Sequence, residues 1–200
     1  MESTSLRIRS TQRPGGRTAD VTRRVNAAVL ALLVEGGVAA CTFAKVAART
    51  GVDRSTLYRR YPDRWEMMID AFMEHVAAEV LPDFTGHFRS DLKSVLWRLA
   101  EALRGPLGPA LMGVTAELRA AHAGDYSRAY FDRRMAQLDP MFEAAIARGE
   151  LAPDVDREEL FTAAAGPVYF RLFIAARGID QAWIDSLVER ICWLYCASGD

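Results

Sequence analysis

The sequence predicts an all-α protein, and two observations support that prediction. Apolar residues recur at spacings of three and four along most of the 200-residue chain, and no stretch sustains an alternation of apolar and polar residues. Glycine and proline divide the chain into segments of helical length. Half of the residues are apolar and 26% are charged, which is typical of a globular chain that can bury a core. Disordered and fibrous classes are therefore excluded.

Charge is distributed unevenly between the first third of the chain and the rest. Residues 1–66 hold 12 Lys and Arg against 6 Asp and Glu, whereas residues 67–200 hold 13 against 20. The basic first third favours a polyanionic partner such as nucleic acid, although basic residues on a solvated face would give the same count. The three cysteines form no disulfide framework or zinc spacing, and we find no secretory signal or membrane-spanning run. We therefore expect a cytoplasmic protein.

The first predicted elements are an arm and a helix. Residues 1–17 hold four arginines around a Pro-Gly-Gly sequence and are predicted to form a flexible basic arm. A helix follows with Thr18 as its expected N-cap and apolar residues along one face. It should end at Gly36 and Gly37, because glycine readily adopts the left-handed conformation that terminates helices.

Two short helices come next, and they form a predicted helix-turn-helix. Thr42 can cap a helix over 43–50, Gly51 breaks it, and a second helix runs from about 54 to 61 before Pro62. Apolar positions pack the two helices together, so three arginines and two hydroxyl residues remain on the outer faces of the second helix. These side chains donate hydrogen bonds from a helix that fits the major groove of DNA. A buried structural helix would not carry them.

The sequence of residues 43–64, FAKVAARTGVDRSTLYRRYPDR, resembles the DNA-binding signature of the TetR family of transcriptional regulators. Arg64 departs from the family, in which lysine is common, and replaces a point charge with a planar guanidinium. The resemblance implies an N-terminal three-helix helix-turn-helix DNA-binding domain over residues 18–66. A larger helical effector-binding and dimerisation domain would occupy residues 67–200.

From this match and from side-chain chemistry, nine residues are expected to contact DNA. Those expected at backbone phosphates are Thr42, Lys45, Tyr58, Tyr61 and Arg64. Those expected at base edges are Arg54, Ser55, Thr56 and Arg59. The arginines of the arm would either enter the minor groove or bind phosphate without sequence preference.

The remaining helices are predicted from periodicity and from their breaks. Residues 65–80 have the clearest apolar period in the chain and would connect the DNA-binding unit to the second domain. Further helices are predicted near 89–104, 107–122, 125–147, 156–177 and 180–197. Pro140 should bend or break the third of these. Pro167 should kink the fourth, which could widen a cavity.

Two sets of apolar residues in this second domain are candidate sites. Candidate cavity-lining residues are Trp97, Met112, Tyr126, Tyr130, Phe131, Phe142, Tyr169 and Phe173, for which ordinary core packing is the alternative. Candidate dimer-interface residues are Leu160, Ala164, Val168, Leu172, Trp183, Leu187 and Ile191, unless their stripes pack within one protomer. The family resemblance implies a four-helix bundle between two copies. Two DNA-binding units about 34–36 Å apart would then read a palindromic site.

Motifs for nucleotide binding, metalloprotease chemistry and serine hydrolases are missing from the sequence, so we predict no catalysis, no cofactor and no metal. The favoured interpretation is a homodimeric transcriptional repressor that binds a DNA operator and is released by a small-molecule effector. A helical enzyme or carrier with a vestigial helix-turn-helix is one alternative, which acidic residues converging in a cavity would favour. An architectural nucleic-acid binder is another, which a closed second domain without a cavity would favour.

Overall fold

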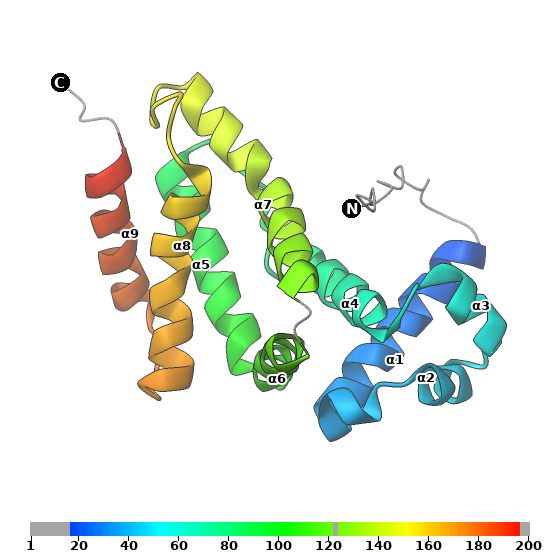
Figure 1. The fold of residues 1–200 in the computed structure, drawn as a ribbon. Helices are drawn as coiled ribbons and strands as arrows, with labels where there is room; N and C mark the ends of the chain where they lie inside the picture. Colours follow the sequence, from blue (N-terminus) through cyan, green and yellow to red (C-terminus); the bar gives the residue numbers. More distant parts are fainter. Residues whose placement is uncertain (1–16, 122–123, 197–200) are drawn as a thin grey trace.

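A computed structural model describes residues 17–121 and 124–196, and Figure 1 shows their helices. Residues 1–16 of the predicted arm lie outside the described residues, and Arg17 begins the first helix. Within the described ranges the α-helices are α1 (Arg17–Ala40), α2 (Phe43–Thr50), α3 (Arg54–Arg60), α4 (Arg64–Glu79), α5 (Phe88–Arg104), α6 (Leu107–Ala120), α7 (Gly124–Ala147), α8 (Arg157–Tyr169) and α9 (Gln181–Tyr195). A π-helix, η1 (Phe170–Ile174), continues α8. The predicted all-α fold is confirmed.

The glycine pair of α1 interrupts the helix where the sequence predicts its end. Gly36 and Gly37 both have non-helical backbone angles, and Gly37 has φ 64°, a value that glycine adopts without steric cost. Helical structure resumes for one short turn up to Ala40. At the other end, α1 begins at Arg17, so Thr18 lies within the first turn and is not the N-cap.

The helix-turn-helix of α2 and α3 forms as predicted. The Thr42 hydroxyl accepts a hydrogen bond from the Lys45 backbone N–H at 3.3 Å, and this cap starts α2. Gly51 ends α2 with φ 68°, the left-handed conformation of a helix C-terminus. Val46 of α2 and Leu57 of α3 are buried in the same apolar cluster as one face of α1. The turn and this shared core fix the direction of α3.

Two prolines within helices have different consequences. The α7 helix continues through Pro140, so it does not break there, and a bend at Pro140 stays a prediction. Pro140 and Ala136 are both exposed, and water can therefore bind the carbonyl group that Pro140 leaves without a helical partner. At Pro167 the predicted irregularity is present. The α-helix ends at Tyr169, and hydrogen bonding shifts to the π pattern of η1.

Two apolar cores lie side by side, and α4 and α6 contribute to both parts of the molecule. Figure 1 shows α1–α3 at one end and α8 and α9 at the other, with α4, α6 and α7 between them. Val114 and Leu118 of α6 are buried in the cluster that holds α1–α3 together. Met68 and Phe72 of α4 belong to the same cluster. The predicted DNA-binding unit, α1–α3, is therefore packed directly against α4 and α6.

None of the described helices is both long enough and apolar enough to span a membrane.

Candidate nucleic-acid interface and ligand cavity

The outer face of α3 carries two arginines that have no ion-pair partner among the described residues. Arg54 and Arg59 are exposed, Ser55 beside them is exposed, and Thr56 is half-buried. Leu57 points the other way, into the core, and so fixes which face α3 turns outward. These four predicted base-contacting residues therefore share a surface on which guanidinium and hydroxyl groups can donate hydrogen bonds.

Three further predicted residues border this face. Lys45 of α2 is exposed, and the Thr42 hydroxyl, although it accepts the capping bond, keeps its own hydrogen for a phosphate oxygen. Tyr58 is 54% exposed, and its ring packs against that of Phe43 with the centroids 4.5 Å apart. This packing holds the phenol at the edge of the α2–α3 surface, where a hydroxyl donor suits phosphate contact.

Tyr61 and Arg64 differ from the rest of the set. The Tyr61 side chain is only 1% exposed and lies in the core of the DNA-binding unit, so its predicted phosphate contact is wrong. Its position just before Pro62 predicts an exposed side chain at the end of α3, but the side chain is buried in the core. Arg64, the first residue of α4, is half-buried with its guanidinium 4.6 Å from the centre of the Trp65 ring. Its charge remains at the surface of the unit.

Other arginines of this unit bind neighbouring groups. Arg49 forms an ion pair with Glu35 at 2.7 Å, and Arg60 donates to the Thr22 hydroxyl. Arg24 donates to the backbone carbonyl of Thr50 at 3.3 Å. The cations without such partners in the described part of the unit therefore include Arg54, Arg59 and Lys45, on the surface expected to meet DNA.

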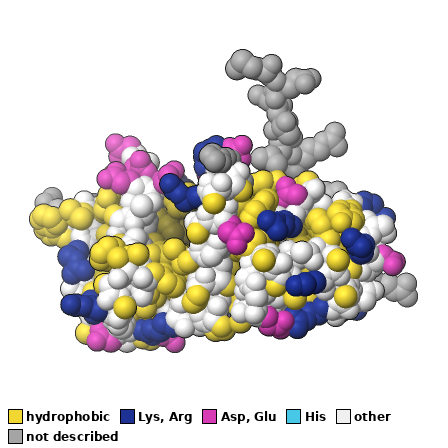
Figure 2. Space-filling model, turned by 60° about the horizontal axis from the view of Figure 1, so that its bottom comes forward, with side chains coloured by type: hydrophobic (Ala, Val, Ile, Leu, Met, Phe, Trp, Pro, Cys, Tyr) yellow, Lys and Arg dark blue, Asp and Glu magenta, His cyan; other side chains and the backbone are white. Residues whose placement is uncertain are grey.

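A cavity of about 410 Å³ lies in the second domain and is walled by helices α4 to α8. This volume is typical of a site for a small organic molecule. The predicted residues Met112, Tyr130, Phe131 and Tyr169 line it. Figure 2 shows a recess with an apolar floor between the α8–α9 end and the centre of the molecule.

Four of the predicted cavity residues do not line this cavity. Phe142 is fully buried and packs against Phe88 with the ring centroids 6.2 Å apart, so it is part of the core. Trp97 packs beneath the guanidinium of Arg104. The remaining two also lie elsewhere: Tyr126 at the contact with α4, and Phe173 on η1. Aromatic character alone does not separate core from cavity, since both environments favour it.

Arg134, which was not among the predicted residues, also lines the cavity. The Arg134 side chain is 5% exposed, and both terminal nitrogens are buried without a hydrogen-bond partner among the described residues. Burial lowers its pKa because the charged form loses hydration. The sequence does contain a signal for it, because Arg134 lies four residues after Tyr130 and four before Leu138, in phase with the buried face of α7.

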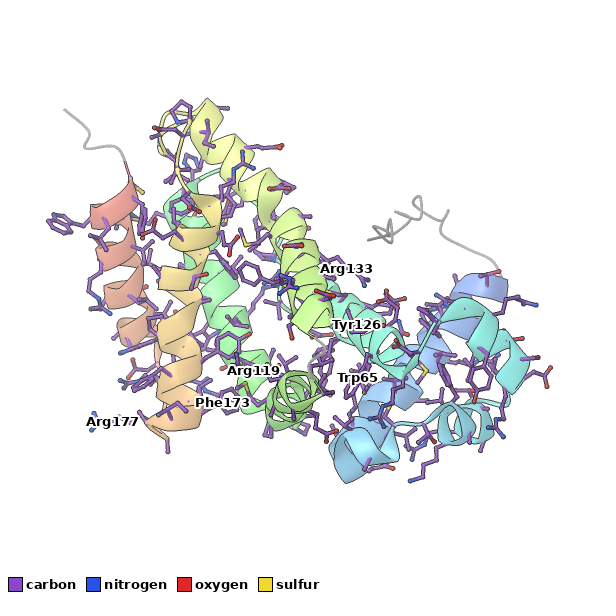
Figure 3. All side chains as sticks on the ribbon, in the orientation of Figure 1. Trp65, Arg119, Tyr126, Arg133, Phe173 and Arg177 are labelled. Carbon is purple, nitrogen blue, oxygen red and sulfur yellow. The ribbon has the colours of Figure 1, made fainter. Side chains whose placement is uncertain are left out.

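Polar contacts join α7, which lines the cavity, to α4, which directly follows the helix-turn-helix. The Tyr126 hydroxyl donates to Asp63, the N-cap of α4, and Arg133 forms an ion pair with Asp70 at 2.6 Å. Figure 3 shows Tyr126 and Arg133 beside α4 and close to Trp65. Burial raises the pKa of Tyr126, and the bond to Asp63 raises it further, to about 12. The phenol therefore stays protonated and can donate at neutral pH.

The stripe predicted to form a dimer interface packs within the chain. Leu160, Ala164 and Val168 are fully buried, and Leu187 and Ile191 are 3% exposed, so none of them is available to a second copy. Leu172 and Trp183 are only partly exposed. The apolar side chains that do reach the surface near this end are Phe170, Ile174, Trp193 and Leu194. The prediction is wrong for the five buried residues, because both helices are apolar on more than one face, and it stays a prediction for Leu172 and Trp183.

An all-α chain with an exposed basic helix in a helix-turn-helix belongs to the class of DNA-binding transcriptional regulators. Comparison with known families agrees. Residues 26–71 match the family described as bacterial regulatory proteins, tetR family, and residues 81–191 match the tetracyclin repressor-like, C-terminal domain. The chain belongs to the TetR family of transcriptional regulators.

Relatives over most of the chain are also transcriptional regulators. The HTH-type transcriptional regulator AqdR of Rhodococcus erythropolis is 31% identical over 86% of this chain and 82% of its own length. The DNA-binding transcriptional repressor TetR of Mycobacteroides abscessus is 30% identical over 86% and 92%. The crystal structure of the TetR family transcription regulator SCO0332 has a TM-score of 0.72 and 30% identity, covering 86% of this chain and 97% of that one.

Proposed function

We propose that the protein is a homodimeric, ligand-responsive repressor that acts in the cytoplasm on a palindromic DNA operator. The observation that carries the proposal is the outer face of α3, where Arg54 and Arg59 stand exposed and without ion-pair partners among the described residues. Arginine donates two parallel hydrogen bonds to guanine, the commonest specific contact in the major groove. The repressor among its relatives, from Mycobacteroides abscessus, supports repression as the outcome of binding.

The apolar surface at the α8–α9 end supports a dimer. Trp193 is 83% exposed, and Phe170, Ile174 and Leu194 are each at least 60% exposed. Phe170 and Ile174 lie near the beginning of α9, and Trp193 and Leu194 lie near its C-terminal end, so exposed apolar side chains occur at both ends of this outer helix. Exposed large apolar side chains are typical of a surface that another protein covers. A two-fold dimer through this end would place the DNA-binding units of two copies on the outside of the assembly.

The cavity supports control by a small molecule, because its walls include the helices that hold the DNA-binding unit. Ile69 and Phe72 of α4 and Val114 and Leu118 of α6 line the cavity, and three of these four also belong to the core around α1. A molecule that fills the cavity contacts α4 and α6 directly. If it binds better to an arrangement of the two units that does not fit DNA, it shifts the population away from the operator complex.

The alternatives lack comparable support. Acidic residues converging in the cavity would favour an enzyme, but the described lining contains no Asp or Glu. A closed second domain would favour an architectural DNA binder, and this domain contains a cavity of about 410 Å³.

Selection of bound duplexes from a random pool tests the DNA-binding part of the proposal. The expected product is a two-fold symmetric consensus with half-sites about 10–10.5 base pairs apart, or a multiple of that spacing. Enrichment of one isolated half-site, or no enrichment, would contradict it.

Sedimentation of a surface variant tests the dimer. Trp193→Ser removes an exposed side chain without opening the core and should shift the protein toward monomer. Val34→Ser, which changes another exposed apolar residue far from that end, should leave the assembly unchanged. If wild type and Trp193→Ser both sediment as monomers, the proposed dimer is contradicted.

A further inference from the structure

Arg134 brings a positive charge into a cavity whose described lining supplies no negative charge. Its side chain is 95% buried, and its guanidinium carbon lies 5.7 Å from the centre of the Phe161 ring, which also lines the cavity. Both terminal nitrogens lack a hydrogen-bond partner among the described residues. Arginine stays protonated in proteins, so the charge is present even where burial disfavours it.

The groups that face Arg134 do not neutralise it. Tyr130 and Tyr169 are its polar neighbours, and burial raises the pKa of both phenols, which therefore stay neutral. Ser127 lines the same cavity, and its hydroxyl is also buried without a described partner. The other polar lining side chains are those of His75, Thr115 and Thr162. None of these groups carries a negative charge at neutral pH.

Elsewhere on α7, the arginines are paired. Arg133, the next residue back, binds Asp70 and Glu66, and Arg128 forms an ion pair with Asp125. A buried charge without a counterion is costly, and proteins normally pair it or replace it. Two unsatisfied N–H directions on one guanidinium are the donor set that a carboxylate or sulfonate takes in a bidentate arrangement.

We propose that the cavity binds an amphipathic organic anion, whose acidic group pairs with Arg134 and whose apolar body lies along the hydrophobic walls of α4, α6 and α8. The inference rests on the proposed effector role of the cavity and specifies the chemical class of the effector. The apolar part contacts side chains such as Phe72, Leu103 and Phe161, which form no hydrogen bonds. The Ser127 hydroxyl, two turns before Arg134 on α7, is a further buried donor in the cavity lining.

A matched pair of fluorescent probes separates the charge from the apolar body. The anion 8-anilino-1-naphthalenesulfonate and neutral N-phenyl-1-naphthylamine share one ring system and differ by the sulfonate. In Arg134→Met, we expect the dissociation constant of the anion to rise about tenfold to a hundredfold, because a charged hydrogen bond is lost. That of the neutral probe should change by less than about threefold.

Arg128→Met is the control for this experiment, because it makes the same change on the same helix outside the cavity lining. It should leave both dissociation constants as in wild type. Equal binding of the anion to wild type and to Arg134→Met would overturn the proposal. So would an equal loss of both probes in a variant whose circular dichroism shows native helix content.

A second measurement uses only the wild-type protein, so it does not depend on how a variant folds. Octanoate and 1-octanol are compared as competitors that displace N-phenyl-1-naphthylamine. The alcohol is the more apolar molecule, so a cavity that recognises only apolar surface favours it. Displacement at a lower concentration of octanoate than of octanol supports the anion site, and the reverse order contradicts it.

These assays contain no DNA, so they separate the ligand class from the regulatory role. The operator complex is titrated with the same sulfonate probe in parallel. The probe could bind in an Arg134-dependent way and still leave the operator complex intact at saturation. That result would support the anion site, but it would contradict the proposal that anions of this class release the operator. Release of the operator by the anion and its neutral analogue at equal concentrations would keep the regulator and reject the role of Arg134.

Discussion

The arginines of α3 and Arg134 of α7 are the same side chain in opposite environments. Arg54 and Arg59 stand in water, where an unpaired guanidinium is well solvated and costs the fold almost nothing. Arg134 is enclosed in an apolar cavity and lacks a partner among the described residues, so its charge is held at a cost. Both environments leave a guanidinium group available to bind an anion. The exposed pair suits the repeating phosphates and base edges of DNA, whereas the enclosed one suits a single small acid.

The difference shows which kind of observation identifies a site. Exposed charges are common on protein surfaces, so an exposed basic helix indicates a binding site only through its residue types and its place in a motif. A buried, unpaired charge is informative by itself, because native proteins rarely leave one. We expect the enclosed region and the exposed region to respond differently to substitution. Four substitutions test this expectation, and they follow in order of expected effect.

The largest effect is expected at the cavity wall, where α6 begins against the end of α5. A Cβ on Gly108 would lie 2.0 Å from the Leu103 carbonyl oxygen, so Gly108→Ala should lower the free energy of unfolding by about 3 kcal/mol or more. Gly113 of the same helix has open space around it, and Gly113→Ala should raise stability by about 0.5–1 kcal/mol. Urea unfolding measures both. Equal changes in the free energy of unfolding of the two variants would contradict this prediction, because they would mean that the cavity wall shifts to accommodate the added methyl group.

The next effect concerns DNA affinity at the exposed face. Arg59→Ala should cost about 1–3 kcal/mol of binding to the selected operator and should flatten base preference at one position. Its stability should stay within about 0.5 kcal/mol of wild type, because the side chain makes no buried contact. Arg104→Ala, on α5 and paired with Glu101, is the control and should leave operator binding unchanged. Retained selectivity in Arg59→Ala would remove that residue from the base-reading set.

The contact between the two regions should contribute less. Tyr126→Phe removes the hydrogen bond to Asp63 and should lower the free energy of unfolding by about 1 kcal/mol. The pKa of Tyr126 is raised from 10.0 to about 12, so the protonated phenol is the form that stabilises the fold. The cost of the substitution should therefore be constant below pH 10 and fall as the pH rises through 12.

Tyr195→Phe provides the comparison for this substitution. The Tyr195 hydroxyl is exposed and lies 3.4 Å from a Glu159 carboxylate oxygen, so its removal should change stability by no more than about 0.5 kcal/mol. Chemical unfolding at pH 7 and pH 11 measures both tyrosines. An equal cost at the two sites would remove the special role of the Tyr126 contact.

The smallest effect is expected for a phosphate contact. Arg64→Ala should weaken binding to specific and nonspecific duplexes alike and should reduce the slope of log affinity against log salt by about one unit. Titrations at several salt concentrations measure that slope. A change confined to the selected operator would place Arg64 at a base instead of a phosphate.

Much of the fold can be predicted from the sequence, because helical periodicity and helix caps are local. The cap of Thr42, the breaks at Gly37 and Gly51 and the exposed face of α3 could all be predicted without knowledge of the tertiary structure. The continuity of α7 through Pro140 could not be predicted from the sequence, because it depends on the freed carbonyl group facing water, and exposure depends on the assembled fold.

The site was less predictable, since it depends on which neighbours each side chain meets. Tyr61 is expected at the surface from its place at the end of α3, but the chain turns it into the core. Phe142 and Tyr130 are both aromatic residues of α7, yet only Tyr130 faces the cavity. Arg134 looks like one half of a solvated arginine pair until its phase along α7 is compared with that of the buried residues.

One experiment tests the central claim, which is that two anion-binding regions of different kinds operate in one chain. Operator affinity and octanoate affinity are measured for Arg59→Ala and Arg134→Met. The account predicts that Arg59→Ala weakens the operator about tenfold or more while octanoate binding stays within about twofold, and that Arg134→Met does the reverse. Loss of both affinities in either variant, or of neither in Arg134→Met, would contradict it.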